Sequence, residues 1–181
     1  MIAESGQRLN QEVIDNIVDN AEANCPHPQF HILLLGDNNL RGGLEPMDSY
    51  VRKCERLANS LKRIPNCHLV LTSVLPSLET QENFFEANRK IRDICYNSNG
   101  HVTFIDFDGV FTRNGAINYK LYADGKHLNS KGSVSLAKMI YEHCVLSMYN
   151  FTYLSRIPLH GYRLVGVWFL LTLGVISSLG A

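Results

Sequence analysis

The chain has 181 residues, of which 45% are hydrophobic and 19% are charged, and its 17 basic residues balance its 17 acidic residues. This length suits one ordinary domain, and the composition excludes a disordered, collagen-like or coiled-coil protein. The neutral balance provides no overall field that would attract nucleic acid, so we do not expect a nucleic-acid partner. The five cysteines contain no Cys-x-x-Cys spacing. They therefore indicate neither a disulfide framework nor a zinc ribbon, and a reducing compartment fits best.

Helical and buried-strand patterns alternate along most of the chain. Apolar residues at helical spacing predict helices over 9–21, 50–61, 82–96 and 130–144. Short continuous apolar runs, which are typical of strands buried on both faces, occur at 30–35, 68–72 and 102–106. Strands that alternate with helices indicate βαβ units. The predicted fold class is therefore α/β, with a parallel sheet and helices on both of its faces in three α/β/α layers.

The two ends of the chain differ in character. The N-terminus lacks the basic start and apolar core of a secretory signal. We divide the chain into a domain over 1–150 and an apolar tail over 151–181, because residues 164–181 carry no charge. That stretch meets the lower length limit for a membrane-spanning helix, so a C-terminal membrane anchor is one interpretation and a buried terminal helix or an appended sequence is the other. The expected location is cytoplasmic or tail-anchored to a membrane.

Candidate residues for chemistry follow the strands, because ligands bind at the carboxyl ends of the strands in sheets of this type. After the first strand, the amide of Asn38 is a candidate hydrogen-bond donor to a ligand oxygen. Asp124 lies three residues before His127, just ahead of the last helix. An Asp that accepts from one ring nitrogen leaves the other nitrogen free to take a proton from a nucleophile. Taken alone, each motif is better explained as a structural turn.

The order of these motifs resembles the SGNH, or GDSL-type, hydrolase family over about residues 30–144. The matching features are a strand that ends in Gly-Asp-Asn-Asn, a strand that ends in Leu-Pro, a helix that contains Asn88, and a final Asp-x-x-His-Leu-x-x-x-Gly. The resemblance implies an SGNH-like, flavodoxin-like fold. It also implies that Asn38 is the oxyanion donor and that Asp124 and His127 are the acid and base of a triad. Asn39 replaces the Asp of the family, and no metal or organic cofactor is implied.

Two blocks of the family have no counterpart in the sequence. One is the N-terminal Gly-Asp-Ser-Leu block with the nucleophilic serine, and the other contributes a glycine to the oxyanion hole. Ser49 and Ser73 do not replace the nucleophile, because position in space and not local sequence makes a triad. We therefore expect a domain truncated at its N-terminus, in which residues 32–35 become an exposed apolar edge open to a protein partner.

Two functions remain open. The first is an ester hydrolase acting on an acyl or acetyl ester, incomplete or inactive as this chain. The second is a non-catalytic binding module, since the family includes inactive members and esterase-like domains of mobile genetic elements. A small basic surface at positions 52, 53, 56, 62 and 63 is interrupted by Glu55 and is better explained as a solvated helix face.

Overall fold

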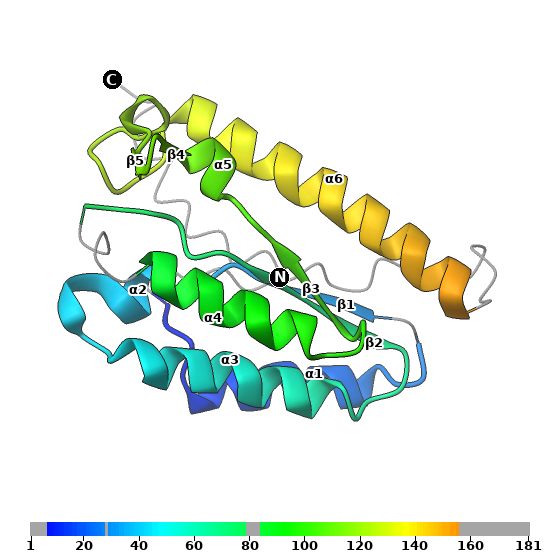
Figure 1. Ribbon diagram of the computed structural model, residues 1–181. Coiled ribbons are helices and arrows are strands. Elements are labelled where there is room, and N and C mark those ends of the chain that lie inside the picture. The colour runs from blue at the N-terminus through cyan, green and yellow to red at the C-terminus, as the bar shows by residue number, and fades with distance from the viewer. Residues whose placement is uncertain (1–6, 28, 79–83, 156–181) are drawn as a thin grey trace, which may run out of the picture.

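The computed structural model describes residues 7–27, 29–78 and 84–155. Three strands, β1 (Gln29–Leu33), β2 (Cys67–Thr72) and β3 (Val102–Ile105), form a parallel sheet in the order β1-β2-β3. Helices α1 (Gln11–Ala23), α3 (Met47–Leu61) and α4 (Phe84–Tyr96) cover one face of the sheet, and α6 (Ser130–Ser155) covers the other (Figure 1). The predicted three-layer α/β class is confirmed.

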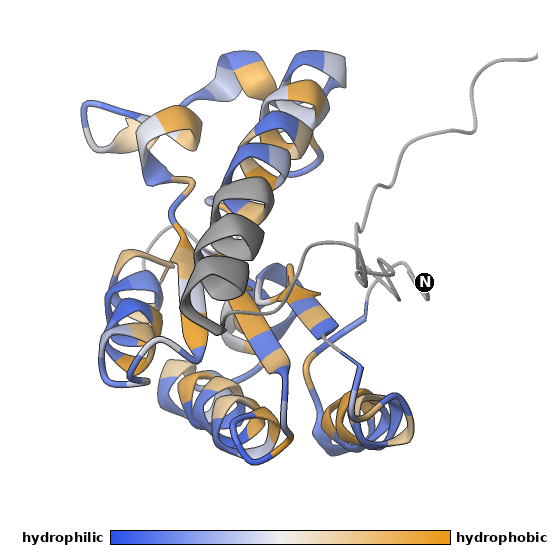
Figure 2. Cartoon of the chain, turned by 90° about the vertical axis from the view of Figure 1, so that its right-hand side faces the viewer, coloured by the Kyte–Doolittle hydropathy of each residue, from blue (hydrophilic) through white to orange (hydrophobic). Residues whose placement is uncertain are grey.

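Two apolar cores lie on the two faces of the sheet. Leu33 and Leu35 pack with residues of α1, α3 and α4, whereas Phe30 and Ile32 pack with residues of α6. Successive side chains of a strand point to opposite faces, so one continuous apolar run supplies both cores. Figure 2 shows the apolar strands between the two helical layers.

Strand β1 lies at the edge of the described sheet, but its side chains are not exposed. Ile32, Leu33, Leu34 and Leu35 are all less than a tenth exposed, with values of 4%, 3%, 8% and 7%. The prediction that residues 32–35 form an exposed apolar edge was therefore wrong for the side chains, because packed helices cover both faces of the strand. An edge leaves unpaired backbone, not necessarily exposed side chains.

Several short elements follow β1 and β3. They are α2 (Asp37–Leu40), a 3-10 turn (Arg41–Gly43), α5 (Asp108–Phe111), the hairpin of β4 (Thr112–Arg113) and β5 (Ala116–Ile117), and η2 (Tyr119–Leu121). Figure 1 shows α2 at the end of the sheet where β1 finishes, and α5 and the hairpin beyond the end of β3. These elements build the loops in which the candidate residues lie.

Helix α6 continues to Ser155 and so passes the predicted boundary between residues 150 and 151. The division of the chain into a domain and a tail stays a prediction. None of the helices within the described residues combines the length and the apolar character that crossing a membrane requires. The stretch 164–181, predicted as an anchor, lies outside the described residues.

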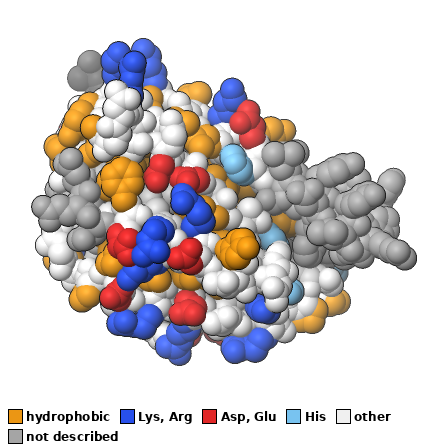
Figure 3. Space-filling view, in the orientation of Figure 1, with side chains coloured by type: hydrophobic (Ala, Val, Ile, Leu, Met, Phe, Trp, Pro, Cys, Tyr) orange, Lys and Arg blue, Asp and Glu red, His pale blue; other side chains and the backbone are white. Residues whose placement is uncertain are grey.

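The face seen in Figure 3 carries basic and acidic side chains side by side. On α4, Arg89 pairs with Glu86 at 2.6 Å, and Lys90 pairs with Asp48 of α3 at 2.5 Å. Lys53, a member of the predicted basic surface, pairs with Glu45 at 2.5 Å. Charges of both signs are therefore interleaved on these helices, which favours the interpretation of a solvated helix face.

Candidate active site

Asn38 lies in the single helical turn that follows β1. Gly36 lies three residues after the end of β1 and directly ahead of α2, with a φ of 126°. A Cβ at this position would lie 2.5 Å from Val74 Cγ2 and 2.7 Å from the Tyr50 hydroxyl. Only glycine permits this backbone and this close approach. The chain can therefore turn sharply at Gly36 into α2 and place Asn38 beyond the carboxyl end of β1.

The amide of Asn38 is largely buried and partly engaged. The residue is 9% exposed, and its Nδ2 donates to the backbone oxygen of Gln7 at 3.1 Å. A primary amide has two N–H donors. Among the described residues, the Gln7 oxygen is the acceptor for this amide, and the second N–H has no acceptor there.

The neighbouring Asn39 has a structural role. Its Oδ1 accepts from the backbone N–H of Leu9 at 2.9 Å, and its Nδ2 donates to the oxygen of Leu9 at 3.0 Å and to Glu45 Oε2 at 2.6 Å. Burial alone would raise the pKa of Glu45, but the hydrogen bonds from Lys53, Ser49 and Asn39 outweigh burial and lower it. An Asp at position 39 would have no donor and would face this carboxylate, which explains the Asn.

Asp124 and His127 form the predicted pair. Asp124 Oδ2 lies 2.6 Å from His127 Nδ1, while Oδ1 accepts from the backbone N–H groups of His127 at 2.7 Å and Lys126 at 3.0 Å. The His127 side chain and these two N–H groups hold the pKa of Asp124 well below its usual range. The ionised carboxylate selects the His127 tautomer with the proton on Nδ1, which leaves a lone pair on Nε2.

The pair is open to solvent. The side chains of His127 and Asp124 are 46% and 55% exposed. No described residue forms a hydrogen bond with His127 Nε2. The ring nitrogen that would take a proton is therefore available to an incoming group.

Asn129 holds the loop that carries this pair. Its Oδ1 accepts from the N–H groups of Lys131 and Gly132, each at 3.0 Å, and so caps the start of α6. Its Nδ2 donates to the oxygens of Lys120 at 2.9 Å and Tyr122 at 3.2 Å. The role of Asn129 was not predicted from the sequence, although an Asn ahead of a predicted helix is the usual signal of an N-cap.

The short loop of Pro76, Ser77 and Leu78 joins the two halves of the site. Three hydrogen bonds make the connection: Ser77 Oγ to Asp37 Oδ1 at 2.9 Å, the Tyr122 hydroxyl to the Pro76 oxygen at 2.6 Å, and the Leu78 N–H to the Gly125 oxygen at 3.2 Å. The first bond reaches the turn of Asn38 and the other two reach the loop of Asp124 and His127. The structure therefore brings the three predicted residues to one end of the sheet.

The serines weighed as nucleophiles have other partners. Ser73 is fully buried, and its Oγ accepts from the Phe107 N–H at 2.9 Å. Ser49 donates to Glu45 Oε1 at 2.7 Å. Neither serine forms a hydrogen bond with His127. Among the described residues we therefore assign no nucleophile.

Asn88, the polar residue on the apolar side of α4, braces the same end of the sheet. It is 1% exposed, accepts from the Val74 N–H at 2.7 Å, and donates to the Val74 oxygen at 3.1 Å and to Asp108 at 3.2 Å. Burial, and then the nearby Asp106, raise the pKa of Asp108. Asn88 thus connects the loops that follow β2 and β3 and has a positioning role.

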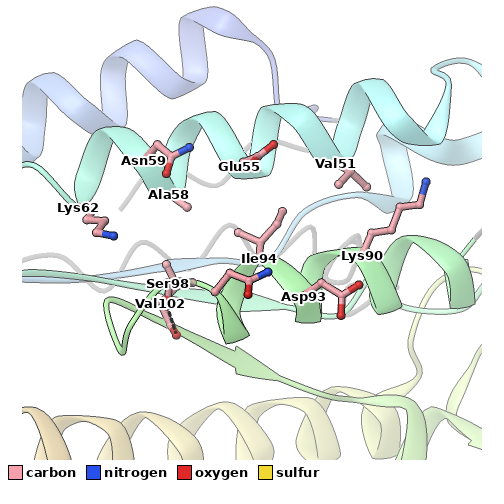
Figure 4. Close-up of a pocket in the computed structure, with 11 residues that line it drawn as sticks. Val51, Glu55, Ala58, Asn59, Lys62, Lys90, Asp93, Ile94, Ser98 and Val102 are labelled. Atoms are coloured by element: carbon pink, nitrogen blue, oxygen red, sulfur yellow. Dashed lines mark hydrogen bonds between the residues drawn. The ribbon is translucent and has the colours of Figure 1, made fainter.

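A cavity of about 340 Å³ lies elsewhere, between α3 and α4 (Figure 4). Its charged lining is mixed in sign and consists of Glu55, Lys62, Lys90 and Asp93. None of Asn38, Asp124 and His127 lines it. The predicted chemistry and this cavity are therefore separate features.

Comparison with known proteins supports the family resemblance. No family model matches the chain. The platelet-activating factor acetylhydrolase IB subunit beta homolog of Drosophila melanogaster is 27% identical in an alignment 135 residues long, which covers 69% of this chain and 56% of that protein. The chain therefore spans about half the length of this curated relative.

Solved structures show the same fold. A protein of Streptococcus pneumoniae, provisionally described as a platelet activating factor, has a TM-score of 0.60 at 20% identity, over 76% of this chain and 68% of that chain. A GDSL-like lipase of Bacteroides thetaiotaomicron has a TM-score of 0.54 at 17% identity, over 77% of this chain and 71% of that chain. The predicted resemblance to GDSL-type hydrolases is confirmed.

Proposed function

We propose that this chain provides the acid–base pair and the oxyanion donor of an ester hydrolase. The observation that carries the proposal is the 2.6 Å contact between Asp124 and the Nδ1 of His127, at the same end of the sheet as Asn38. The curated relative, by its name an acetylhydrolase, supports an acyl or acetyl ester as the substrate class. The roles of the three residues are part of the proposal.

In the proposed reaction, His127 acts as the general base. Nε2 takes the proton of a serine hydroxyl while the serine Oγ bonds to the ester carbonyl carbon. The π electron pair of the carbonyl group moves to the carbonyl oxygen. The second N–H of Asn38 donates to this oxyanion. When the oxyanion collapses, the bond to the alcohol breaks and the alcohol takes the proton from Nε2. Water then repeats these steps and releases the acid.

The serine of this scheme is not among the described residues. The chain spans 56% of the Drosophila relative, and we propose that a polypeptide segment beyond the described residues supplies the nucleophile. Loss of a triad nucleophile lowers turnover on the order of 10⁶-fold, although oxyanion and binding contributions leave a residual rate. We therefore expect this chain alone to hydrolyse esters slowly.

The test is hydrolysis of 4-nitrophenyl acetate by the full chain and by variants. His127→Ala is expected to lower this residual rate at least tenfold, because without the serine Nε2 of His127 takes the proton of a water molecule that attacks the activated ester directly. Imidazole side chains hydrolyse activated esters without a site, so His101→Ala is the matched control. His101 is exposed and lies ahead of β3, at the opposite end of the strands from Asn38. Equal rates for the two variants would contradict the proposal.

The edge of β1 that faces away from β2 favours a second candidate function, that of a non-catalytic binding module with a protein partner. The N–H of Gln29 donates to Asn66, and the oxygen of Leu33 accepts from Thr72 of β2. Backbone groups alternate in direction along a strand, so those of Ile32 point to the other side. Within the described chain, no strand pairs on that side. Partner binding that persists in a His127→Ala variant without ester turnover would favour this candidate.

A further inference from the structure

Two exposed apolar side chains lie beside the candidate active site. Leu78 is 55% exposed and Tyr119 is 51% exposed. Both approach Gly125, the residue after Asp124. A Cβ on Gly125 would lie 2.5 Å from Leu78 Cδ1 and 3.8 Å from Tyr119 Cε1. We call Leu78 and Tyr119 the apolar lip.

The apolar lip has a fixed position relative to the reacting groups. The Leu78 N–H donates to the Gly125 oxygen at 3.2 Å, within the turn that carries Asp124 and His127. The residue before Leu78 is Ser77, which donates to Asp37 at 2.9 Å, next to Asn38. Leu78 therefore lies in the segment that connects the oxyanion donor with the general base.

The exposure of the lip indicates a ligand with a hydrocarbon part. Burial of apolar surface is favourable in proportion to its area, so a ligand that covers these two side chains gains free energy of binding. A methyl group on an ester carbonyl is too short to cover both side chains, whereas an alkyl chain of several carbons can do so. The neighbouring Asn38 and His127 suit the polar end of the same molecule.

We propose that the apolar lip binds the hydrocarbon chain of an ester substrate and makes medium-chain esters better ligands than acetyl esters. The identification of the ligand as an ester rests on the proposed function. Binding of a hydrocarbon chain at Leu78 and Tyr119 rests only on the position and exposure of these two side chains.

The test uses decanoate, hexanoate and butyrate as probes, because their carboxylates cannot be hydrolysed. Binding to the full ¹⁵N-labelled chain is followed by the NMR shift of the Gly125 amide. Decanoate is expected to shift the signal of this amide saturably. From butyrate to decanoate, the affinity is expected to rise about twofold for each added methylene, since the lip covers only one side of the hydrocarbon. A Gly125 amide that does not respond to decanoate would overturn the proposal.

Variants of the lip separate apolar contact from loss of folding. Leu78→Ser and Tyr119→Ser are each expected to weaken decanoate binding about fivefold, while Leu78→Met retains it because the side chain stays apolar. Tyr96→Ser is the matched control: Tyr96 is 89% exposed and ends α4, at the end of the sheet away from the site. Equal weakening by Leu78→Met and Leu78→Ser, or by Tyr96→Ser, would contradict the assignment.

The outcomes for the lip and for the hydrolase are distinguishable. Decanoate binding at Gly125 without any His127-dependent ester turnover supports the lip and contradicts the proposed hydrolase. His127-dependent turnover with the same rates for 4-nitrophenyl acetate and 4-nitrophenyl decanoate, and no response at Gly125, contradicts the lip alone.

Discussion

Asp124 holds His127 at two points, the ring Nδ1 at 2.6 Å through Oδ2 and the backbone N–H at 2.7 Å through Oδ1. The carboxylate therefore fixes both the backbone of His127 and the orientation of its ring. A ring held in this way keeps Nε2 directed outward before any substrate arrives, which reduces the reorganisation that proton transfer needs.

This contact predicts the tautomer of His127. In the wild-type chain at pH 8, the ¹⁵N shifts of His127 should show a protonated Nδ1 and an unprotonated Nε2. Asp124→Asn replaces the charged acceptor and is expected to yield a mixture of both tautomers. The shifts of His101 should be the same in both proteins, and an unchanged His127 tautomer in Asp124→Asn would contradict the assigned contact.

Asn39→Asp should destabilise the fold, because it removes both donors from a fully buried amide and places a carboxylate against Glu45. The expected loss is about 1–3 kcal/mol in the free energy of unfolding, measured by urea denaturation. The control is Asn59→Asp, the same substitution at an exposed position of α3. Similar losses for the two variants would show that Asn39 has no special role.

Gly36→Ala should destabilise the fold by more than about 3 kcal/mol, because it combines a positive φ with a clash against Val74 and Tyr50. In the control Gly109→Ala, no atom lies within 4 Å of the added Cβ, and Gly109 belongs to α5. The free energy of unfolding of Gly109→Ala is expected to exceed that of the wild type by no more than about 1 kcal/mol. Thermal unfolding of both variants measures the difference.

The buried His31 and His68 predict that stability falls in mild acid. The pKa of each is lowered to about 4, by burial for His31 and by burial and then the nearby His101 for His68. The unfolded chain binds protons at these positions below about pH 6.5. The folded chain does not bind them until about pH 4, so stability is full above pH 6.5 and falls as the pH drops toward 4. The expected loss between pH 7 and pH 5 is on the order of 2 kcal/mol for each histidine.

Urea denaturation at pH 7 and pH 5 measures this loss. His31→Leu should reduce the difference between the two pH values by about half, because one of the two buried histidines is gone. His27→Leu is the control, since His27 is exposed and should leave the difference as it is in the wild type. A wild-type chain equally stable at both pH values would show that these histidines are protonated in the folded state.

The layers of the fold could be predicted because their signals are local. The apolar run that contains β1 and the helical spacing of α3 are each contained within a few consecutive residues, as is the Asp-x-x-His motif. The four residues of α5 and the two residues of β4 are too short for any periodicity to show. The sequence pattern also placed the first helix at Leu9, whereas the side chain of Asn10 caps α1 and leaves Leu9 outside it.

The connections within the candidate site could not be predicted from the sequence. Ser77 and Asp37 are 40 positions apart, and Tyr122 and Pro76 are 46 positions apart. Each of these hydrogen bonds depends on how two loops meet in three dimensions, and no spacing in the sequence reports it. For the same reason, the exposure of β1 was misjudged, because the cover of an edge strand comes from distant helices.

The side chain of Asn39 imitates a peptide group, since its amide offers Leu9 the same donor and acceptor that a neighbouring strand would offer. The segment before α1 is thereby held against α2 by two hydrogen bonds like those of one residue pair in a sheet. Gln7 belongs to that segment and contacts the amide of Asn38 across 31 positions of sequence. Shortening the chain by a few residues at this point would therefore alter the environment of the oxyanion donor before it altered either core.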